Sequence, residues 1–176
     1  MAEDLHGRIV VITGAGSGIG EALAGRFRSD GAHVAGCDLP HAIESVSTAC
    51  DLAVAADVTN AEEMNAFAAQ VIERFGRVDA LIANAGVARA ATIQDGAWDD
   101  IESVVRVNLF GVLHSIRAFL PIMREQGQGR IVALASRTLR SARRGSWATA
   151  LRRPLWSLQH APWRVSWKAA IFSSTT

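Results

Sequence analysis

Short apolar runs and helical patterns alternate along the first 136 residues of this 176-residue chain. Residues 8–13 (Arg-Ile-Val-Val-Ile-Thr) are β-branched and almost continuously apolar, as in strands covered on both faces of a parallel sheet. Further runs predict strands at residues 32–37, 53–56, 79–83 and 129–136. Helical patterns predict a helix over 21–28 and a long helix over about 98–123. Beyond residue 136 the periodicity fades, and Pro154 and Pro162 interrupt any helix.

Four glycines, at positions 14, 16, 18 and 20, lie between the first strand and the first helix. A strand, a glycine-rich turn and a helix start predict a phosphate site, because backbone N–H groups point at the anion and the missing side chains let it approach. An ordinary tight turn remains the alternative. The spacing Gly14-x-x-x-Gly18-x-Gly20 differs from the usual dinucleotide fingerprint.

Asp38 ends the second predicted strand, about 20 residues beyond the glycines, where dinucleotide-binding domains place an acidic residue. A carboxylate there can accept hydrogen bonds from both hydroxyl groups of the adenosine ribose. It would also repel a 2′-phosphate, so it favours NAD over NADP. The alternative is a solvated aspartate at a strand end.

The glycine spacing resembles that of the short-chain dehydrogenase/reductase family, and more of the family's motifs follow in order. Asp57-Val58 closes the third strand, Asn84-Ala85-Gly86 the fourth and Ser136 the fifth, and Asn108 lies in the long helix. The resemblance covers residues 5–136. It implies these cofactor-binding residues: Gly14, Ser17, Gly18, Ile19, Gly20, Asp38, Asp57, Val58, Asn84, Ala85 and Gly86.

The resemblance also implies a fold and a division of the chain. We expect an α/β, Rossmann-like, doubly wound parallel sheet of strand order 3-2-1-4-5, with helices on both faces. Two further strands of the family's sheet have no counterpart, so the fold would be incomplete at its C-terminal side. Residues 1–136 would form the NAD-binding domain, and residues 137–176 would be a tail without a native fold.

The family interconverts alcohols and ketones with a nicotinamide cofactor, and its chemistry depends on a tyrosine. In the family, a lysine four residues later lowers the pKa of that tyrosine, a serine (here Ser136) orients the substrate oxygen, and an asparagine (here Asn108) kinks its helix and holds a water of the proton relay. This chain has no tyrosine, and Lys168, its only lysine, follows Arg164 by four residues. Thr149 has the nominal tyrosine position, but its hydroxyl is a far weaker acid than a phenol. We therefore expect little or no turnover.

Charge divides the chain sharply after Ser136. Residues 1–136 hold 10 basic and 17 acidic side chains, whereas residues 137–176 hold 8 basic side chains, no acidic ones and four of the five tryptophans. A basic tail with interleaved aromatics could bind nucleic acid, and a basic amphipathic segment could lie on an acidic membrane surface.

Translation out of frame is the third interpretation of the tail, and the one we favour. Reading the codons of residues 148–156 from the third base of the Ala148 codon permits Tyr-x-x-x-Lys-Ala-Ala close to where the family has its catalytic tyrosine. The ancestral activity would then be NAD-dependent alcohol–ketone hydride transfer. A non-catalytic NAD-binding or nucleic-acid-binding module is the alternative function.

The remaining features favour a reduced, intracellular setting. Cys37 and Cys50 lack metal-ligand spacing and no two histidines are four residues apart, so no metal site is expected. The acidic N-terminus lacks an apolar signal core, and no segment reads as a membrane span, which together predict a cytoplasmic protein. We expect a small-molecule alcohol or ketone as partner and neither nucleic acid nor membrane. The family's homo-oligomer would lack part of its interface, because the long helix packs there against a helix that follows the tyrosine.

Overall fold

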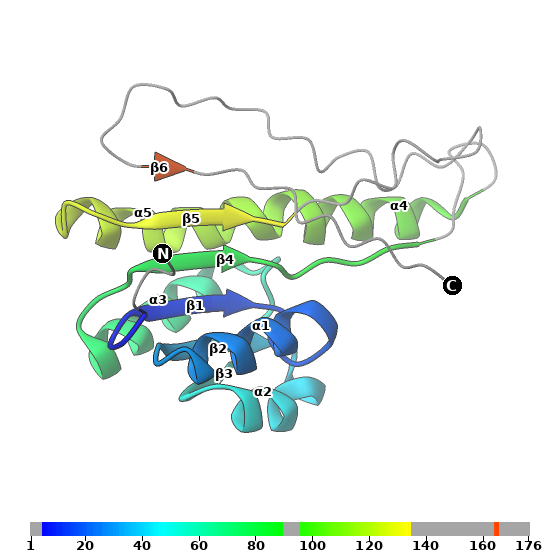
Figure 1. The fold of residues 1–176 in the computed structure, drawn as a ribbon. Helices are drawn as coiled ribbons and strands as arrows, with labels where there is room; N and C mark the ends of the chain where they lie inside the picture. Colours follow the sequence, from blue (N-terminus) through cyan, green and yellow to red (C-terminus); the bar gives the residue numbers. More distant parts are fainter. Residues whose placement is uncertain (1–4, 90–95, 135–163, 166–176) are drawn as a thin grey trace.

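A computed structural model describes residues 5–89, 96–134 and 164–165 of the chain. The strands form one parallel sheet in the order β3-β2-β1-β4-β5-β6 (Figure 1), so the order predicted for the first five is confirmed. The fold is α/β and Rossmann-like. The strands are β1 (Ile9–Thr13), β2 (His33–Asp38), β3 (Leu52–Ala55), β4 (Ala80–Ala83), β5 (Arg130–Ala133) and β6 (Arg164–Val165).

Strand β6 differs from the expectation of no strand beyond the fifth. It comes from the basic segment 137–176 and pairs in parallel with β5, Arg164 opposite Arg130 and Val165 opposite Ile131. The open side of β5 presents backbone N–H and C=O groups, and a short extended segment can satisfy them whatever its side chains. Sequence periodicity gives no signal for a strand of two residues.

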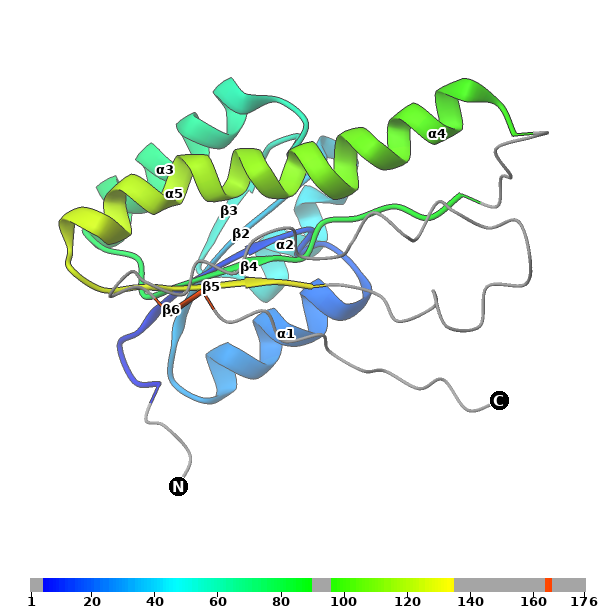
Figure 2. The same cartoon turned by 90° about the horizontal axis from the view of Figure 1, so that it is seen from above.

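Helices cover both faces of the sheet. Helices α1 and α2 pack on one face, and α3 and α5 pack on the other, where α4 continues the line of α5 (Figure 2). The helical elements are α1 (Gly18–Ser29), the 3-10 turn η1 (Pro40–Ala42), α2 (Ile43–Ala49), α3 (Ala61–Phe75), α4 (Trp98–Val105), the π-helical segment η2 (Arg106–Gly111) and α5 (Val112–Glu125).

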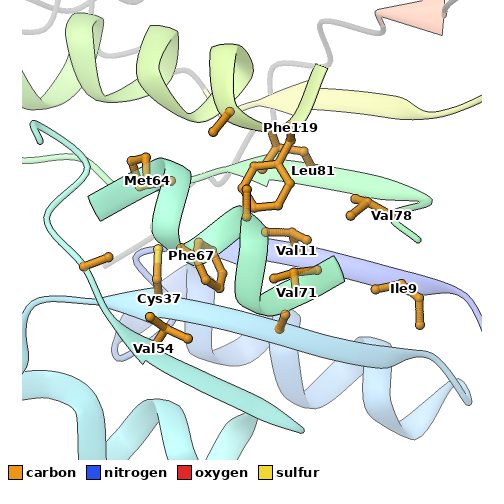
Figure 3. Packing of buried hydrophobic residues seen from close by; sticks show 14 of the residues in the cluster. Ile9, Val11, Cys37, Val54, Met64, Phe67, Val71, Val78, Leu81 and Phe119 are labelled. Carbon is orange, nitrogen blue, oxygen red and sulfur yellow. The ribbon is translucent and has the colours of Figure 1, made fainter. Parts of the chain in front are cut away.

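Strand β1 is buried at all five positions and divides the core into two layers. Because successive side chains of a strand point to opposite faces, Ile9 and Val11 join the layer under α3 and α5, and Val10 and Ile12 join the layer over α1 and α2. Figure 3 shows the first layer, in which the rings of Phe67 and Phe119 meet edge to face with centroids 5.6 Å apart.

A network of hydrogen bonds around Asp79 holds together the starts of β1 and β4. Its carboxylate accepts hydrogen bonds from Ile9 N (2.9 Å), Arg8 Nη1 (2.9 Å) and Arg77 Nη2 (2.7 Å). Burial alone raises the pKa of this carboxyl, but the bond from Ile9 N and the two guanidinium groups outweigh it and hold the pKa below its ordinary value. The ionised side chain therefore ties β1 to the start of β4.

The long helix corrects the expectation that no segment could span a membrane. Residues 98–125 form one 28-residue helical stretch that is long and apolar enough to cross a bilayer. Some of these apolar residues belong to the core of the folded domain, where they are buried: Ile101, Val104, Ala118, Phe119 and Met123. Length and hydropathy alone therefore do not separate a core helix from a span.

Candidate dinucleotide-binding site

The first four strands end at one edge of the sheet, and backbone hydrogen bonds join the loops after β1 and β3 to the end of β2. Gly14 N and Ala15 N donate to Cys37 O at 2.8 and 3.1 Å, and Ala56 N donates to Asp38 O at 2.9 Å. Parallel α/β sheets bind ligands at this carboxyl edge. The loops after β1, β2, β3 and β4 carry the predicted cofactor-binding residues.

Three of the four glycines of the turn lie so close to neighbouring residues that a side chain would not fit. Gly14 has φ +67°, and a Cβ there would lie 2.8 Å from the Cα of Ala85. A Cβ on Gly20 would collide with the carbonyl oxygen of Gly14 and lie 2.6 Å from Asn84 Nδ2. On Gly16 it would come within 2.8 Å of the Ala42 side chain. The turn is therefore a bare backbone cradle.

Helix α1 begins inside this cradle, at Gly18, earlier than the predicted residue 21. Ser17 is its extended N-cap and makes no side-chain capping bond, and Glu21 N donates to Ser17 O at 3.3 Å. The N–H groups of the first turn, from Gly18 to Gly20, have no acceptor within an α-helix, and the helix dipole is positive there. Gly18 has φ +54°, and Ile19 is partly exposed beside it. This backbone can hold an anion.

Asp38 lies against the same cradle. Its Oδ2 accepts a hydrogen bond from Gly16 N at 2.9 Å, and its Oδ1 accepts one from Leu39 N at 2.8 Å. The side chain is only partly buried. A carboxylate thus borders the glycine turn.

Asn84 fastens the glycine turn to β4. Its Nδ2 donates to the carbonyl oxygens of Thr13 and Gly14, both at 3.0 Å. The hydroxyl of Thr13 accepts from Asn84 N and Ala85 N, both at 3.1 Å. Gly86 follows at an exposed position. Thr13 is 1% exposed and was not among the predicted site residues. A polar residue at the end of a buried apolar strand was the signal that could have indicated its role.

The loop after β3 is held by the start of α3. Asp57 Oδ1 accepts from Thr59 N at 2.8 Å, and the Asn60 side chain caps α3 by accepting from Glu62 N and Glu63 N. The Glu63 carboxylate accepts in return from Asp57 N and Asn60 Nδ2, both at 2.7 Å. The spacing Asn-x-x-Glu at 60–63 resembles a capping box and could have predicted this helix start.

Asn108 lies within the π-helical segment η2, where the resemblance implied a kink. The side chain is 6% exposed. Its Oδ1 accepts from Val87 N and its Nδ2 donates to Val87 O, both at 2.9 Å. Asn108 therefore fixes the chain that leaves Asn84-Ala85-Gly86. Ser136, Thr149 and Lys168 lie outside the described residues.

The two cysteines are buried, and their thiols are not activated. Burial raises the pKa of both, and that of Cys50 reaches about 12. Because the thiolate is the reactive form, both thiols are inert at neutral pH. In the ranges that the structure describes, no three His, Cys, Asp or Glu side chains gather as metal ligands.

The family model for short chain dehydrogenases matches residues 8–147, and the chain belongs to this family of oxidoreductases. The match ends two residues before Thr149. An uncharacterised oxidoreductase of Staphylococcus haemolyticus is 39% identical over 140 residues, which are 76% of this chain and 60% of the relative. One of Mycobacterium bovis is 35% identical over 144 residues, 77% of this chain and 58% of the relative. The chain thus spans about 60% of the length of these relatives.

Solved structures give the same family. A short-chain dehydrogenase/reductase of Burkholderia phymatum in complex with NAD superimposes with a TM-score of 0.78 at 32% identity, over 85% of this chain and 56% of that chain. A 3-ketoacyl-(acyl-carrier-protein) reductase of Brucella melitensis complexed with NADH gives 0.77 at 32% identity, over 83% and 64%. A nicotinamide cofactor is thus bound by similar folds.

Proposed function

We propose that this domain binds NAD at the carboxyl edge of its sheet. The observation that carries the proposal is the bare cradle of Gly14, Gly16 and Gly20 with the Asp38 carboxylate at its border. The α1 N-terminus would hold the pyrophosphate, since its first N–H groups point out of the helix. Asp38 would accept from the ribose hydroxyls, and a 2′-phosphate would meet its negative charge.

The other predicted residues complete this assignment. Asp57 and Val58 would contact adenine, and Asn84, Ala85 and Gly86 would line the path toward the nicotinamide. When bound, NAD supplies the hydride acceptor for oxidation of an alcohol to a ketone. The contribution of this chain is to bind and orient that group through backbone N–H donors and one carboxylate.

We propose further that the chain binds NAD with little or no turnover of an alcohol or ketone. Proton transfer in the family needs a phenol with a lowered pKa, and the sequence contains no tyrosine. Asn108 and Ser136 would remain as candidate catalytic residues. The family match ends at residue 147, inside the segment 137–176 and before Thr149, and this end supports translation out of frame within that segment. A cytoplasmic location is part of this proposal.

A homo-oligomer like that of the family would use the outer face of the long helix. Phe110 and Leu113 are 47% and 44% exposed there. Without its partner helix this apolar face would promote aggregation. A binding role for the basic segment 137–176, with nucleic acid as ligand, is the second candidate function and rests on its 8 basic and no acidic side chains. Salt-sensitive DNA or RNA binding that disappears on deletion of residues 137–176 would favour it.

Titration calorimetry with NAD and NADP tests the cofactor assignment. We expect Asp38→Ser to weaken NAD binding about 10- to 150-fold, because hydrogen bonds to a charged group contribute about 1.5–3 kcal/mol. The preference for NAD over NADP should become smaller. Asp30→Ser, at the opposite end of α1, is the matched control and should bind as the wild type does. The cofactor assignment is contradicted if the wild type does not bind NAD, or if Asp38→Ser binds NAD as tightly as the wild type does. Rapid NAD-dependent turnover of an alcohol by the wild type contradicts the loss of catalysis.

A further inference from the structure

Helix α5 and segment η2 contact the loop that follows β3, far away in the sequence. The ring nitrogen Nδ1 of His114 lies 3.0 Å from the carbonyl oxygen of Val58, across 56 positions of the chain. A carbonyl oxygen can only accept, so Nδ1 carries the proton and donates. His114 is partly buried, and its ring also contacts that of Phe110, with centroids 6.4 Å apart.

Gly111 brings the helix close enough for this contact. A Cβ at position 111 would lie 2.6 Å from Cγ2 of Val58, a residue that is itself buried. The missing side chain lets the loop rest on the helix backbone. The His114 ring, three residues further along, then reaches the carbonyl group of Val58.

The loop has two further supports on its other side. The turn bond from Thr59 N to Asp57 Oδ1 and the bond from Asp57 N to the Glu63 carboxylate fix the residue before Val58. Thr59 N and the Val58 carbonyl belong to one peptide group, which is bonded to Asp57 Oδ1 through its N–H and to His114 through its oxygen. The peptide groups before Asp57 and after Val58 are therefore set by Glu63 of α3 and His114 of α5.

We propose that His114 is a positioning residue for adenine recognition, acting through the Val58 carbonyl. The inference rests on the proposed function, in which Asp57 and Val58 contact adenine. The adenine edge offers an amino donor beside a ring-nitrogen acceptor, which is complementary to a carboxylate oxygen and a backbone N–H group. A rotation of the peptide group between Val58 and Thr59 would break the bond from Thr59 N to Asp57 Oδ1 and so misalign the carboxylate of this pair.

The test compares NAD with nicotinamide hypoxanthine dinucleotide, whose purine edge has an oxygen and a ring N–H in place of the amino group and the ring nitrogen. The wild type should bind NAD more tightly than this analogue. His114→Phe keeps the ring packing and removes the donor. We expect it to weaken NAD binding about 3- to 10-fold, the worth of one hydrogen bond, with little change for the analogue.

Two variants separate positioning from general stability. His114→Asn places an amide N–H near the position of Nδ1 and should restore the preference for NAD. Arg117→Leu changes an exposed residue on the same helix and should leave both affinities unchanged. If His114→Phe does not fold, His114→Leu takes its place in the comparison.

The possible failures are distinguishable. A wild type that binds neither dinucleotide overturns the proposed function and this inference with it. A wild type that binds NAD, with His114→Phe keeping the same preference for NAD, overturns the inference alone. Equal weakening of both ligands also overturns it, because a loss of general stability would act on both.

Discussion

Substitution of Gly20 by alanine tests the close approach on which the cofactor site depends. Helix propensity alone favours alanine by about 1 kcal/mol. In this structure, however, the new Cβ would collide with Gly14 O and lie 2.6 Å from Asn84 Nδ2. Relief requires a shift of the amide that bonds to the carbonyl oxygens of Thr13 and Gly14. Overpacking costs about 1–3 kcal/mol and each lost hydrogen bond about 1 kcal/mol, so the net loss of stability should be about 2 kcal/mol.

Gly25→Ala supplies the matched control, since Gly25 lies in the same helix and a Cβ there would meet nothing within 4 Å. It should stabilise the protein by about 0.5–1 kcal/mol. Urea unfolding followed by far-UV circular dichroism measures both free energies of unfolding, and titration with NAD measures binding. A Gly20→Ala variant as stable as Gly25→Ala, with wild-type affinity for NAD, would refute the close approach.

Two further predictions concern side chains that accept hydrogen bonds from backbone N–H groups. The folded-state pKa of Asp79 lies below its unfolded value of about 3.9, so its contribution to stability is complete above that pH and disappears as the pH falls through the folded-state pKa. Asp79→Asn should thus be less stable at neutral pH and approach the wild type in acid, and urea unfolding at several pH values measures the gap; a gap independent of pH would contradict this. Thr13→Val leaves two backbone N–H groups without their acceptor and should lose about 2 kcal/mol of stability in urea unfolding, whereas Thr13→Ser should lose less. If Thr13→Val and Thr13→Ser lost the same stability, the loss would come from side-chain packing and not from the hydrogen bonds.

The apolar runs were sufficient to place the first five strands, each close to its predicted range, and the family resemblance implied their order. These strands are covered on two faces, so their continuous apolar runs stand out against the helical patterns between them. The start of α1 was predicted three residues late, because glycines in its first turn mask the helical pattern. The π-helical segment coincides with the implied kink at Asn108.

The contacts of the site were less predictable. Thr13 with Asn84 and His114 with Val58 are joined across 71 and 56 positions. Periodicity indicates which face of an element is buried, but it does not identify the partner that meets a given side chain. The bond from Asp38 to Gly16 N depends in the same way on how two loops fold together. Ser136 stays a prediction.

The burial of Cys37 and Cys50 makes the native domain a convenient background for chemical labelling. Both cysteine side chains are buried and keep their protons at neutral pH, so alkylating reagents have no thiolate to attack. A cysteine introduced at an exposed position such as Leu113 would be the one reactive thiol of the folded protein. A fluorophore or spin label attached there would report on the outer face of the long helix without removal of any native residue from the core.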